Sequence, residues 1–397
     1  MIFLQAARAA LSGKPCLNRI QASLSLLASL ILAAGLFSCG NSYTGAAPSH
    51  YAYVTLPQTG NVMLLQIDGA TGSLTVGPET PAVQNATTIG LALLPSKKFL
   101  YGMNSFSNTI SIFSVASDGT LSLTGTPMPS GNGPYAAAID PSGKYLLVTN
   151  SYGSNSSGGD ISVYSIDSGS GALTEVAGSP FPANADPSEI LIAPTGKTVY
   201  VTNPAIGMVT AFSFSGGVLA QLSTSPVFSG KGATGLAMDA TGRFLFVANP
   251  LATNSPPYSA TLGNITGFNI DPSTGGLSSM LGSPFAATSG NAPTQVAIDP
   301  GGRFLYATTP GSGDSIWCFT IDPTSGQLIA TTSSPFSLAA GAQFALFDPT
   351  GGRFYIGNAN GSAIEAYTYN PSTGALTAIT GSPFSVSAQP GKMVFSE

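Results

Sequence analysis

A short apolar strand motif that recurs seven times limits what this chain can fold into more than any other feature. The copies are YAYVTL (51–56), FLYGMN (99–104), YLLVTN (145–150), VYVTN (199–203), FLFVAN (244–249), FLYATT (304–309) and FYIGN (354–358). A regular period of about 20 to 50 residues is typical of solenoids and propellers. Residues 51–397 provide about 50 residues for each of the seven units, which fits a blade of four short strands.

Each copy is followed by a second strand and a turn, as in NITGFNIDPSTGGL at residues 264–277. Strict alternation in this strand predicts a half-buried strand with one more exposed face. Asp, Pro, Ser, Thr and Gly in the turn favour tight reversal of the chain. A four-stranded unit cannot bury its apolar surface alone, so the units must stack around an axis. The sequence therefore predicts an all-β fold, a seven-bladed β-propeller of four-stranded blades.

The ends of the repeat array predict how the ring closes. A further strand segment precedes the apolar motif in later units, as at residues 136–140 and 295–299, but the first unit lacks it. The C-terminal segment GKMVFS, residues 391–396, matches this missing strand. We expect the C-terminal strand to complete the first blade and to remove an open sheet edge.

The amino terminus has the pattern of a targeting segment. Arg8, Lys14 and Arg19 precede a run without charge at residues 22–37, which is followed by Ser38 and Cys39. A basic region, an apolar region and a small residue before the cleavage site predict a secretory signal peptide over residues 1–38. An uncleaved signal anchor is the alternative, because about 20 apolar residues span a bilayer.

The segment LFSC at residues 36–39 resembles the bacterial lipobox. This resemblance implies cleavage before Cys39, lipidation of that cysteine, and residues 39–50 as a flexible tether. Several acyl chains anchor a protein stably to a membrane. We therefore expect an exported protein of the bacterial cell envelope, in the outer membrane if the host is Gram-negative. Cys16 leaves with the signal peptide, so Cys318 becomes the free thiol of the mature chain, without an intrachain disulfide.

Charge excludes one class of partner. The chain has 12 basic and 17 acidic residues, a net charge of −5, and only 7% charged residues. Beyond residue 20 the sequence has no basic run. A nucleic-acid-binding protein needs a basic patch or stripe, so we expect no nucleic-acid partner.

Three motifs resemble a known family. The segments VYVTN (199–203), IDPSTGGL (270–277) and IDPGGRFLY (298–306) are similar to those of the seven-bladed lactonase family, which includes bacterial 6-phosphogluconolactonases. They also resemble the YVTN propeller repeats of bacterial surface proteins. The resemblance covers residues 51–397 and implies the propeller fold, with hydrolysis of a sugar lactone as one candidate activity.

Charged residues at equivalent turns of the repeat have two interpretations. The basic set is Lys98, Lys144, Lys197, Arg243, Arg303 and Arg353, between the first and second strands of six units. The acidic sets are Asp140, Asp239, Asp299 and Asp348 at the end of the first strand, and Asp68, Asp167, Asp271 and Asp322 at the outer turn. We interpret the basic residues as solvated turn residues, with a cationic ring as the alternative. The aspartates are interpreted as turn formers that accept backbone hydrogen bonds.

Candidate site residues occur where the repeat is broken. When the seven units are aligned, one equivalent position in the first-strand segment forms a column across the repeat. This column holds Gly90, Ala136, Glu189, Gly235, Gln295, Phe344 and Lys392. If this column faces the mouth of the central channel, Glu189 and Lys392 lie on nearly opposite walls. Together with Gln295 they are candidates to bind a polar ligand, and Lys231 and Asp186 belong to loops at the same rim. A wet channel that tolerates any polar side chain is the alternative.

Two long loops are further candidates. Residues 151–159 and 250–263 exceed their equivalents in the other units, and loops on a rigid scaffold often carry function. Tyr152 and Tyr258 would suit stacking on a sugar or aromatic ligand, although unselected surface insertions are an equal alternative. Trp317 belongs to a column expected on the less buried strand face, packed under a loop or in contact with a partner. Cys318 is expected to be a small buried residue.

The residue types that are missing limit the chemistry. His50 is the only histidine, so a Ser-His-Asp centre or a zinc site with paired histidines is not expected, nor is a cofactor. Any general base would be a carboxylate such as Glu189. The sequence favours a binding or interaction module for a glycan, another envelope protein or a small molecule. A lactone hydrolase with Glu189 as base, and with Lys392 and Lys231 holding the substrate, is the alternative.

Overall fold

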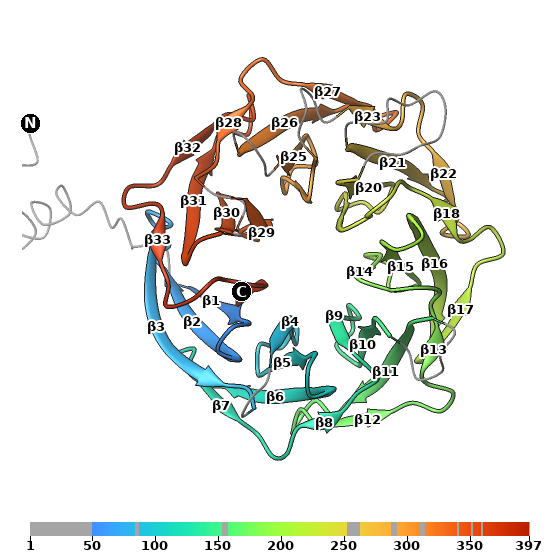
Figure 1. Ribbon diagram of the computed structural model, residues 1–397, viewed down its shortest axis with the longest axis vertical. Coiled ribbons are helices and arrows are strands. Elements are labelled where there is room, and N and C mark those ends of the chain that lie inside the picture. The colour runs from blue at the N-terminus through green and yellow to red at the C-terminus, as the bar shows by residue number, and fades with distance from the viewer. Residues whose placement is uncertain are drawn as a thin grey trace, which may run out of the picture. The chain divides into compact units, whose positions relative to one another are not determined.

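Seven antiparallel sheets form a ring in the computed structural model (Figure 1), which confirms the predicted seven-bladed β-propeller. The described residues are 50–83, 87–152, 158–251, 263–286, 292–309, 314–339, 341–350, 352–358 and 360–396, all within the unit Ser49–Glu397. The predicted signal peptide, Cys39, most of the tether and Tyr258 lie outside these residues. No helix among the described residues is long and apolar enough to span a membrane.

The strands of each blade follow one another in the chain, except in the first blade. Blade 1 consists of β1 (His50–Leu56), β2 (Asn61–Ile67), β3 (Leu74–Pro81) and β34 (Met393–Ser396). Blade 2 consists of β4 (Thr88–Leu93), β5 (Phe99–Asn104), β6 (Thr109–Val115), β7 (Leu121–Leu123) and β8 (Met128–Pro129). Blade 3 consists of β9 (Pro134–Ile139), β10 (Tyr145–Asn150), β11 (Asp160–Ile166), β12 (Leu173–Glu175) and β13 (Phe181–Pro182). Blade 4 consists of β14 (Ile190–Ile192), β15 (Thr198–Asn203), β16 (Met208–Ser215), β17 (Val218–Gln221) and β18 (Val227–Phe228).

The remaining three blades repeat this pattern. Blade 5 consists of β19 (Gly235–Met238), β20 (Phe244–Asn249), β21 (Asn264–Ile270), β22 (Leu277–Ser279) and β23 (Phe285–Ala286). Blade 6 consists of β24 (Gln295–Ile298), β25 (Phe304–Thr309), β26 (Ser315–Ile321), β27 (Leu328–Ala330) and β28 (Phe336–Ser337). Blade 7 consists of β29 (Ala342–Phe347), β30 (Arg353–Asn358), β31 (Ala363–Tyr369), β32 (Leu376–Ala378) and β33 (Phe384–Ser385). In blades 2 to 7 the last, two-residue strand pairs with the third strand, so four main strands define each blade.

The C-terminal strand closes the ring as predicted. β34 pairs antiparallel with β1, from Tyr51 opposite Ser396 to Val54 opposite Met393. The backbone N–H of Thr55 continues this ladder by donating to the carbonyl of Lys392 at 2.8 Å. β1 thereby gains an inner neighbour, as the second strand of every other blade has.

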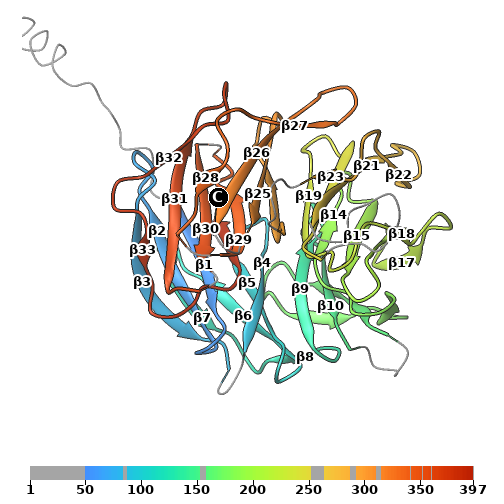
Figure 2. The ribbon, with the colours of Figure 1, turned by 45° about the horizontal axis from the view of Figure 1, so that its top comes forward.

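The ring has two different faces, which Figures 1 and 2 show from the front and tilted. We call one the mouth face: here the chain enters each inner strand, and here lie the loops that join the second and third strands. We call the other the turn face, because it carries the turns from the inner to the second strand. His50 begins β1 at the turn face, and Pro57 follows the other end of β1 at the mouth face.

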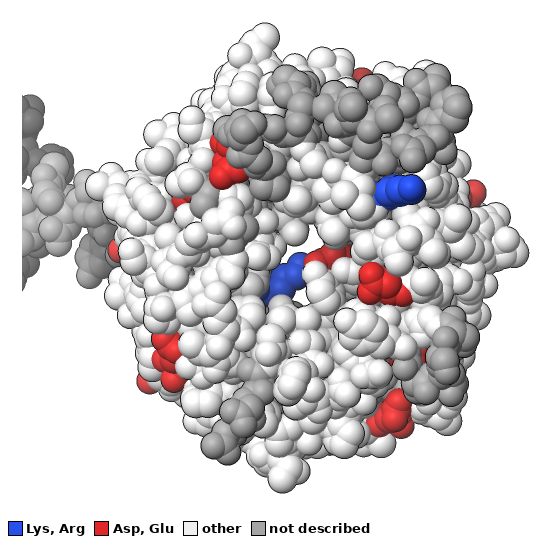
Figure 3. Space-filling model, in the orientation of Figure 1, with Lys and Arg blue, Asp and Glu red and all other residues white. Residues whose placement is uncertain are grey.

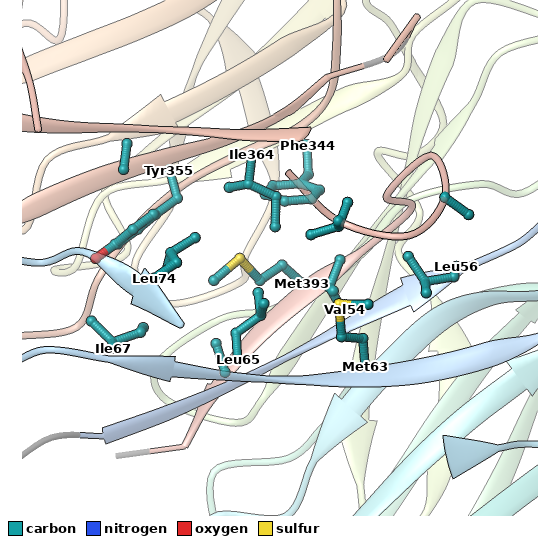
Figure 4. Close-up of a cluster of buried hydrophobic side chains, with 14 of the residues drawn as sticks. Val54, Leu56, Met63, Leu65, Ile67, Leu74, Phe344, Tyr355, Ile364 and Met393 are labelled. Carbon is teal, nitrogen blue, oxygen red and sulfur yellow. The ribbon is translucent and has the colours of Figure 1, made fainter. Parts of the chain in front are cut away.

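The hydrophobic core is divided among the interfaces between neighbouring blades. The cluster between blades 7 and 1 includes Val54, Leu65, Tyr355 and Ile364, and Met393 of the closing strand packs into it (Figure 4). Along β1, Val54 packs toward blade 7, while its neighbour Tyr53 belongs to the cluster shared with blade 2. Alternate residues of a strand therefore face different blades, and both faces become buried.

This packing corrects the expectation that the alternating strands are half-buried. The column of Trp317 was expected on the less buried face, but its members Met63, Ser111 and Thr210 are at most 1% exposed. Trp317 itself is partly buried against the core between blades 5 and 6. A blade with neighbours on both sides has no solvent face in its middle strands, which is why the alternation was misleading.

Tyrosines of the second strand join one blade to the next. Their buried hydroxyls donate to the carbonyl of a glycine in the outer turn of the following blade at 2.8 to 3.0 Å. These pairs are Tyr53 to Gly119, Tyr101 to Gly171, Tyr200 to Gly275, Tyr306 to Gly374 and Tyr355 to Gly72. Burial raises the pKa of these phenols, that of Tyr200 to about 12, so they remain hydrogen-bond donors.

Charged residues of the turn face hold turns and blades: the aspartates form turns as interpreted from the sequence, whereas three arginines, interpreted as solvated, bind the next blade. Buried Asp299 accepts hydrogen bonds from the backbone N–H groups of Gly301, Arg303 and Phe304. The guanidinium of Arg303 then donates to the carbonyl of Pro371 in blade 7 at 2.9 Å. Arg243 and Arg353 make the same kind of contact with blades 6 and 1. Lys98, Lys144 and Lys197 are exposed.

Candidate functional site

A pocket of about 420 Å³ lies at the mouth of the central channel. Its walls come from the segments that lead into the inner strands of all seven blades. The described lining residues are Pro57, Ile89, Tyr135, Glu189, Thr234, Thr294, Gln295, Ala342, Gln343, Gln389, Pro390, Gly391 and Lys392. Figure 3 shows a basic and an acidic area meeting at the central hollow of this face.

The structure brings Glu189 and Lys392 into direct contact across the channel. The Nζ atom of Lys392, from blade 1, lies 2.5 Å from Oε1 of Glu189, from blade 4. The two side chains are 27% and 17% exposed. Burial works against the charged ammonium, but attraction by Glu189 and the hydrogen bond to it outweigh burial and raise the pKa of Lys392. The two residues predicted on opposite walls therefore form an ion pair within the pocket.

Equivalent threonines fix the backbone of both partners. Lys392 donates its backbone N–H to Oγ1 of Thr55 at 2.8 Å. Glu189 does the same with Oγ1 of Thr202 at 3.1 Å, and the N–H of Thr202 donates back to the carbonyl of Glu189. Because Thr55 and Thr202 occupy the same position in their blades, the repeat itself places the two charged residues at the same height.

Six polar uncharged side chains line the pocket beside the ion pair, together with Pro57, Ile89, Ala342, Pro390 and Gly391. Amides come from Gln295, Gln343 and Gln389, and hydroxyls come from Tyr135, Thr234 and Thr294. The amide of Gln389 accepts a hydrogen bond from Gln58 at 3.3 Å. Burial and the nearby carboxylate of Glu189 raise the pKa of Tyr135, so its hydroxyl stays protonated. Gln295 was predicted for this site, but the other five side chains were missed.

β-bulges explain several of the residues that sequence reasoning missed. Register shifts lie between Thr88 and Gly90 in blade 2 and between Ala342 and Phe344 in blade 7. Blade 3 has a register shift opposite Thr149, at Tyr135 and Ala136 of the inner strand. A bulge inserts one residue and can re-aim its side chain. Ile89, Tyr135 and Gln343 reach the pocket in this way, one position before the column that was compared across the repeat.

Other predicted site residues lie on the same face but outside the pocket wall. Lys231 is exposed on the connection into blade 5. Asp186 is half-buried with a φ of 51°, and its charge contributes to the raised pKa of Tyr135. Tyr152 is 70% exposed at the rim of blade 3. Tyr258 and Cys39 lie outside the described residues.

Two alternative sites receive no support from the geometry. Cys318 is fully buried, and burial raises the pKa of its thiol to about 11, which confirms it as a core residue. Within the described ranges, no group of three or more His, Cys, Asp or Glu side chains is placed to hold a metal ion.

The fold and the pocket together define a closed seven-bladed β-propeller with a polar site at the mouth of its channel. The sequence matches the family described as Lactonase, 7-bladed beta-propeller, over residues 46–180 and 262–390. The chain belongs to this family. Glu189 and Lys392 both lie outside the matched ranges, so the match gives the ion pair no family role. The search of curated proteins found no match.

Solved structures share the fold at low sequence identity. A periplasmic gluconolactonase from Pseudomonas aeruginosa is 18% identical, with a TM-score of 0.72, and the match covers 88% of this chain and 99% of that one. A candidate 6-phosphogluconolactonase from Bacteroides uniformis is 19% identical, with a TM-score of 0.71 and coverage of 88% and 99%. A protein from Lactobacillus plantarum is 17% identical, with a TM-score of 0.69 and coverage of 88% and 100%. At these identities the likeness shows the fold alone.

Proposed function

We propose that this propeller is a binding module that takes a neutral, polyhydroxylated ligand of the sugar class into the mouth pocket. The observation that carries the proposal is the ion pair between Lys392 and Glu189. Each charge already has its counter-charge, so an ionic ligand would have to break the pair, and an unpaired, partly buried charge is costly. A neutral ligand leaves the pair intact.

The remaining chemistry of the pocket fits hydroxyl groups. Amides of Gln295 and Gln343 offer both donors and acceptors. The hydroxyl of Thr234 donates to the carbonyl of Thr294 at 3.0 Å, which leaves its oxygen to accept a hydrogen bond from a ligand. The pocket volume of about 420 Å³ falls within the range of small-molecule sites, about 300 to 1,000 Å³. A single sugar ring fits this space and can form several hydrogen bonds at once.

Calorimetric titration tests this proposal with two matched sets of probes. The neutral set is glucose, galactose, mannose and N-acetylglucosamine, and the acidic set is gluconate and glucuronate. We expect saturable binding of at least one neutral sugar, with Gln343→Ala weakening it about tenfold through loss of hydrogen bonds. Lys144→Ala, on the turn face, is the control and should bind normally. Preference for the acidic set would contradict the proposal, as would failure of every neutral sugar to bind.

Hydrolysis of a sugar lactone is a second candidate, supported by membership of the lactonase family. A neighbour of similar fold is named a periplasmic gluconolactonase. In this reaction Glu189 would accept a proton from water as the water oxygen attacks the lactone carbonyl. As the ring C–O bond breaks, Glu189 would return this proton to the departing ring oxygen, which gives a hydroxy acid. Lys392 would lie near the oxygen that gains negative charge.

Proton release separates the two candidates. Glucono-δ-lactone and its 6-phosphate are added at constant pH, and the rate above spontaneous hydrolysis is measured. A hydrolase should accelerate the reaction, lose this acceleration in Glu189→Gln and keep it in Lys144→Ala. Neutral-sugar binding with no acceleration would leave the binding module as the function.

We also propose that the protein is exported and anchored in the bacterial cell envelope through lipid on Cys39. The lipobox-like segment at residues 36–39 supports this proposal. Membrane fractionation should find the parent protein lipidated, whereas Cys39→Ala should accumulate as an unprocessed precursor. Processing and release of this variant at the parental rate would show that the segment is not a lipoprotein signal.

A further inference from the structure

Three exposed aromatic side chains belong to neighbouring segments at the rim of blades 2 and 3. Phe106, Tyr135 and Tyr152 are 81%, 37% and 70% exposed. Phe106 and Tyr152 belong to equivalent loops between second and third strands, and Tyr135 lines the mouth pocket. We call these three residues the aromatic shelf. Large apolar side chains are usually removed from water, so this exposure needs an explanation.

Hydrogen bonds hold both loops against the segment that leads to Tyr135. Oδ1 of Asn108, from the loop of Phe106, accepts from the backbone N–H of Gly133 at 2.8 Å. The side-chain amide of Asn108 donates to Asn132, and the N–H of Tyr152 donates to the carbonyl of Asn132. The shelf is therefore a built surface, fixed to two adjacent residues of one connection.

A glycine brings the ring of Tyr152 close to the pocket. Gly133 has a φ of 67°, and a Cβ atom there would approach Cδ2 of Tyr152 to 2.6 Å. The ring thus lies against the backbone of Gly133, which is two residues, or about 7 Å of chain, from Tyr135. The ring of Tyr152 therefore lies against the same short segment that carries the pocket-lining Tyr135.

We propose that the ligand of the mouth pocket is an oligosaccharide, with one ring in the pocket and at least one further ring on the aromatic shelf. This inference rests on the proposed binding of a neutral sugar and names its class. The C–H face of a pyranose is apolar, and aromatic rings offer it a flat apolar partner with an electron-rich face. On the face in Figure 3, the described surface around the opening is mostly uncharged, which suits a neutral chain.

The equivalent rim of blades 4 and 5 provides a matched comparison within the molecule. Ile206 and Leu251 occupy the corresponding loops and are 40% and 57% exposed. The N–H of Leu251 donates to the carbonyl of Lys231, and its side chain lies against Gly232. This rim has the same construction with aliphatic side chains, which lack the flat rings that stack on a sugar. Substitutions there test exposure and loop position without aromatic stacking.

The experiment compares binding of saccharides of increasing length to the purified chain. Three series of one, two and three rings are titrated. The first is glucose, cellobiose and cellotriose. The second is glucose, maltose and maltotriose, and the third is N-acetylglucosamine, chitobiose and chitotriose. In at least one series we expect a gain of about tenfold or more from one ring to two or three. Tyr152→Ala and Phe106→Ala should remove this gain and leave binding of the single sugar unchanged, while Ile206→Ala and Leu251→Ala should keep the gain.

Each other result overturns a defined statement. Equal affinity for short and long members of every series would overturn the oligosaccharide proposal while leaving sugar binding in place. Equal weakening of short and long saccharides by Tyr152→Ala would assign the shelf a structural role and would also overturn it. Failure of all saccharides to bind would overturn the proposed function itself, and the oligosaccharide proposal with it.

Discussion

The mouth face and the turn face are built from the same seven units but use their polar residues differently. At the turn face, Asp299 and its equivalents accept hydrogen bonds from their own turns, and arginines such as Arg303 bind the next blade. At the mouth face, Gln295, Gln343 and the pair of Glu189 and Lys392 face a cavity. The charged groups of the turn face hold turns and blades, whereas those of the mouth face pair with each other beside amides that line a cavity.

This difference shows where a repeat protein keeps its structural residues and where it can change. Asp at the end of the inner strand recurs in several units because each turn needs the same acceptor. Glu189 and Lys392 occur once each, in a column that is otherwise mostly small or apolar. Residues common to the repeat should therefore affect stability, and residues unique to one blade should affect binding.

Deleting residues 392–397 should have the largest effect, because it acts on both faces. It removes β34, leaves blade 1 without its inner strand, and removes Met393 from the core and Lys392 from the pocket. We expect a loss of several kcal/mol, a large part of the roughly 5 to 15 kcal/mol that stabilises a typical domain. Thermal and urea unfolding measure it, and unchanged unfolding would show that β34 does not close the ring.

Asp299→Ala should lower stability without changing ligand binding. The carboxylate is buried, and its loss leaves three backbone N–H groups without their acceptor. We expect a loss of about 3 kcal/mol, the upper range for hydrogen bonds to a charged group. Asp322→Ala, at an exposed outer turn, is the control and should cost less. If Asp299→Ala instead kept the stability of the parent protein and bound the sugar more weakly, the proposed difference between the two faces would be wrong.

Tyr355→Phe should have a smaller effect on stability. The buried hydroxyl donates to the carbonyl of Gly72 at 2.8 Å across the interface between blades 7 and 1. Removing this hydrogen bond should cost about 1 kcal/mol, measured by urea unfolding. Tyr152→Phe removes an exposed hydroxyl and is the control. Equal stabilities of both variants would indicate that the inter-blade hydrogen bonds contribute little.

Lys144→Ala should have the smallest effect, on stability and on binding alike. Lys144 is exposed on the turn face, and isolated surface charges contribute little. Lys392→Ala is the opposing variant, because it leaves Glu189 without its partner in the pocket. Titration of both variants with the same sugar compares their affinities, and we expect Lys392→Ala to bind more weakly than Lys144→Ala. Equal affinities would show that the ion pair has no part in the site.

The repeat allowed the number of blades and the position of the closing strand to be predicted, since GKMVFS supplies the segment that the first unit lacks. The burial of Ser111 and Thr210 was not predicted. Alternation distinguishes the two faces of a strand, but it does not show that both faces pack against neighbouring blades. That information arises only when the blades are assembled into a ring.

The candidate site was predicted in part. Glu189, Gln295 and Lys392 were singled out because they break a column, and all three line the pocket. Tyr135 and Gln343 were missed because bulges place their side chains there. Thr294 and Gln295 are adjacent, yet both line the pocket, which a regular strand with a period of two would not allow. Comparing equivalent positions across the seven units assumes that every strand is regular. The segments that lead into the inner strands are irregular, so this comparison missed some of the residues that line the pocket.

The closing strand also determines when the pocket comes into existence during folding. The hydrogen bond from the backbone N–H of Lys392 to Oγ1 of Thr55 joins residues 337 positions apart. By contrast, the four main strands of each of the other six blades follow one another in the chain. Contacts between distant residues form slowly because the chain entropy of loop closure must be overcome first. The cation of the pocket is therefore acquired last, and incompletely folded chains lack the site. A ligand that requires the finished pocket binds the completed ring alone and shifts the folding equilibrium toward it.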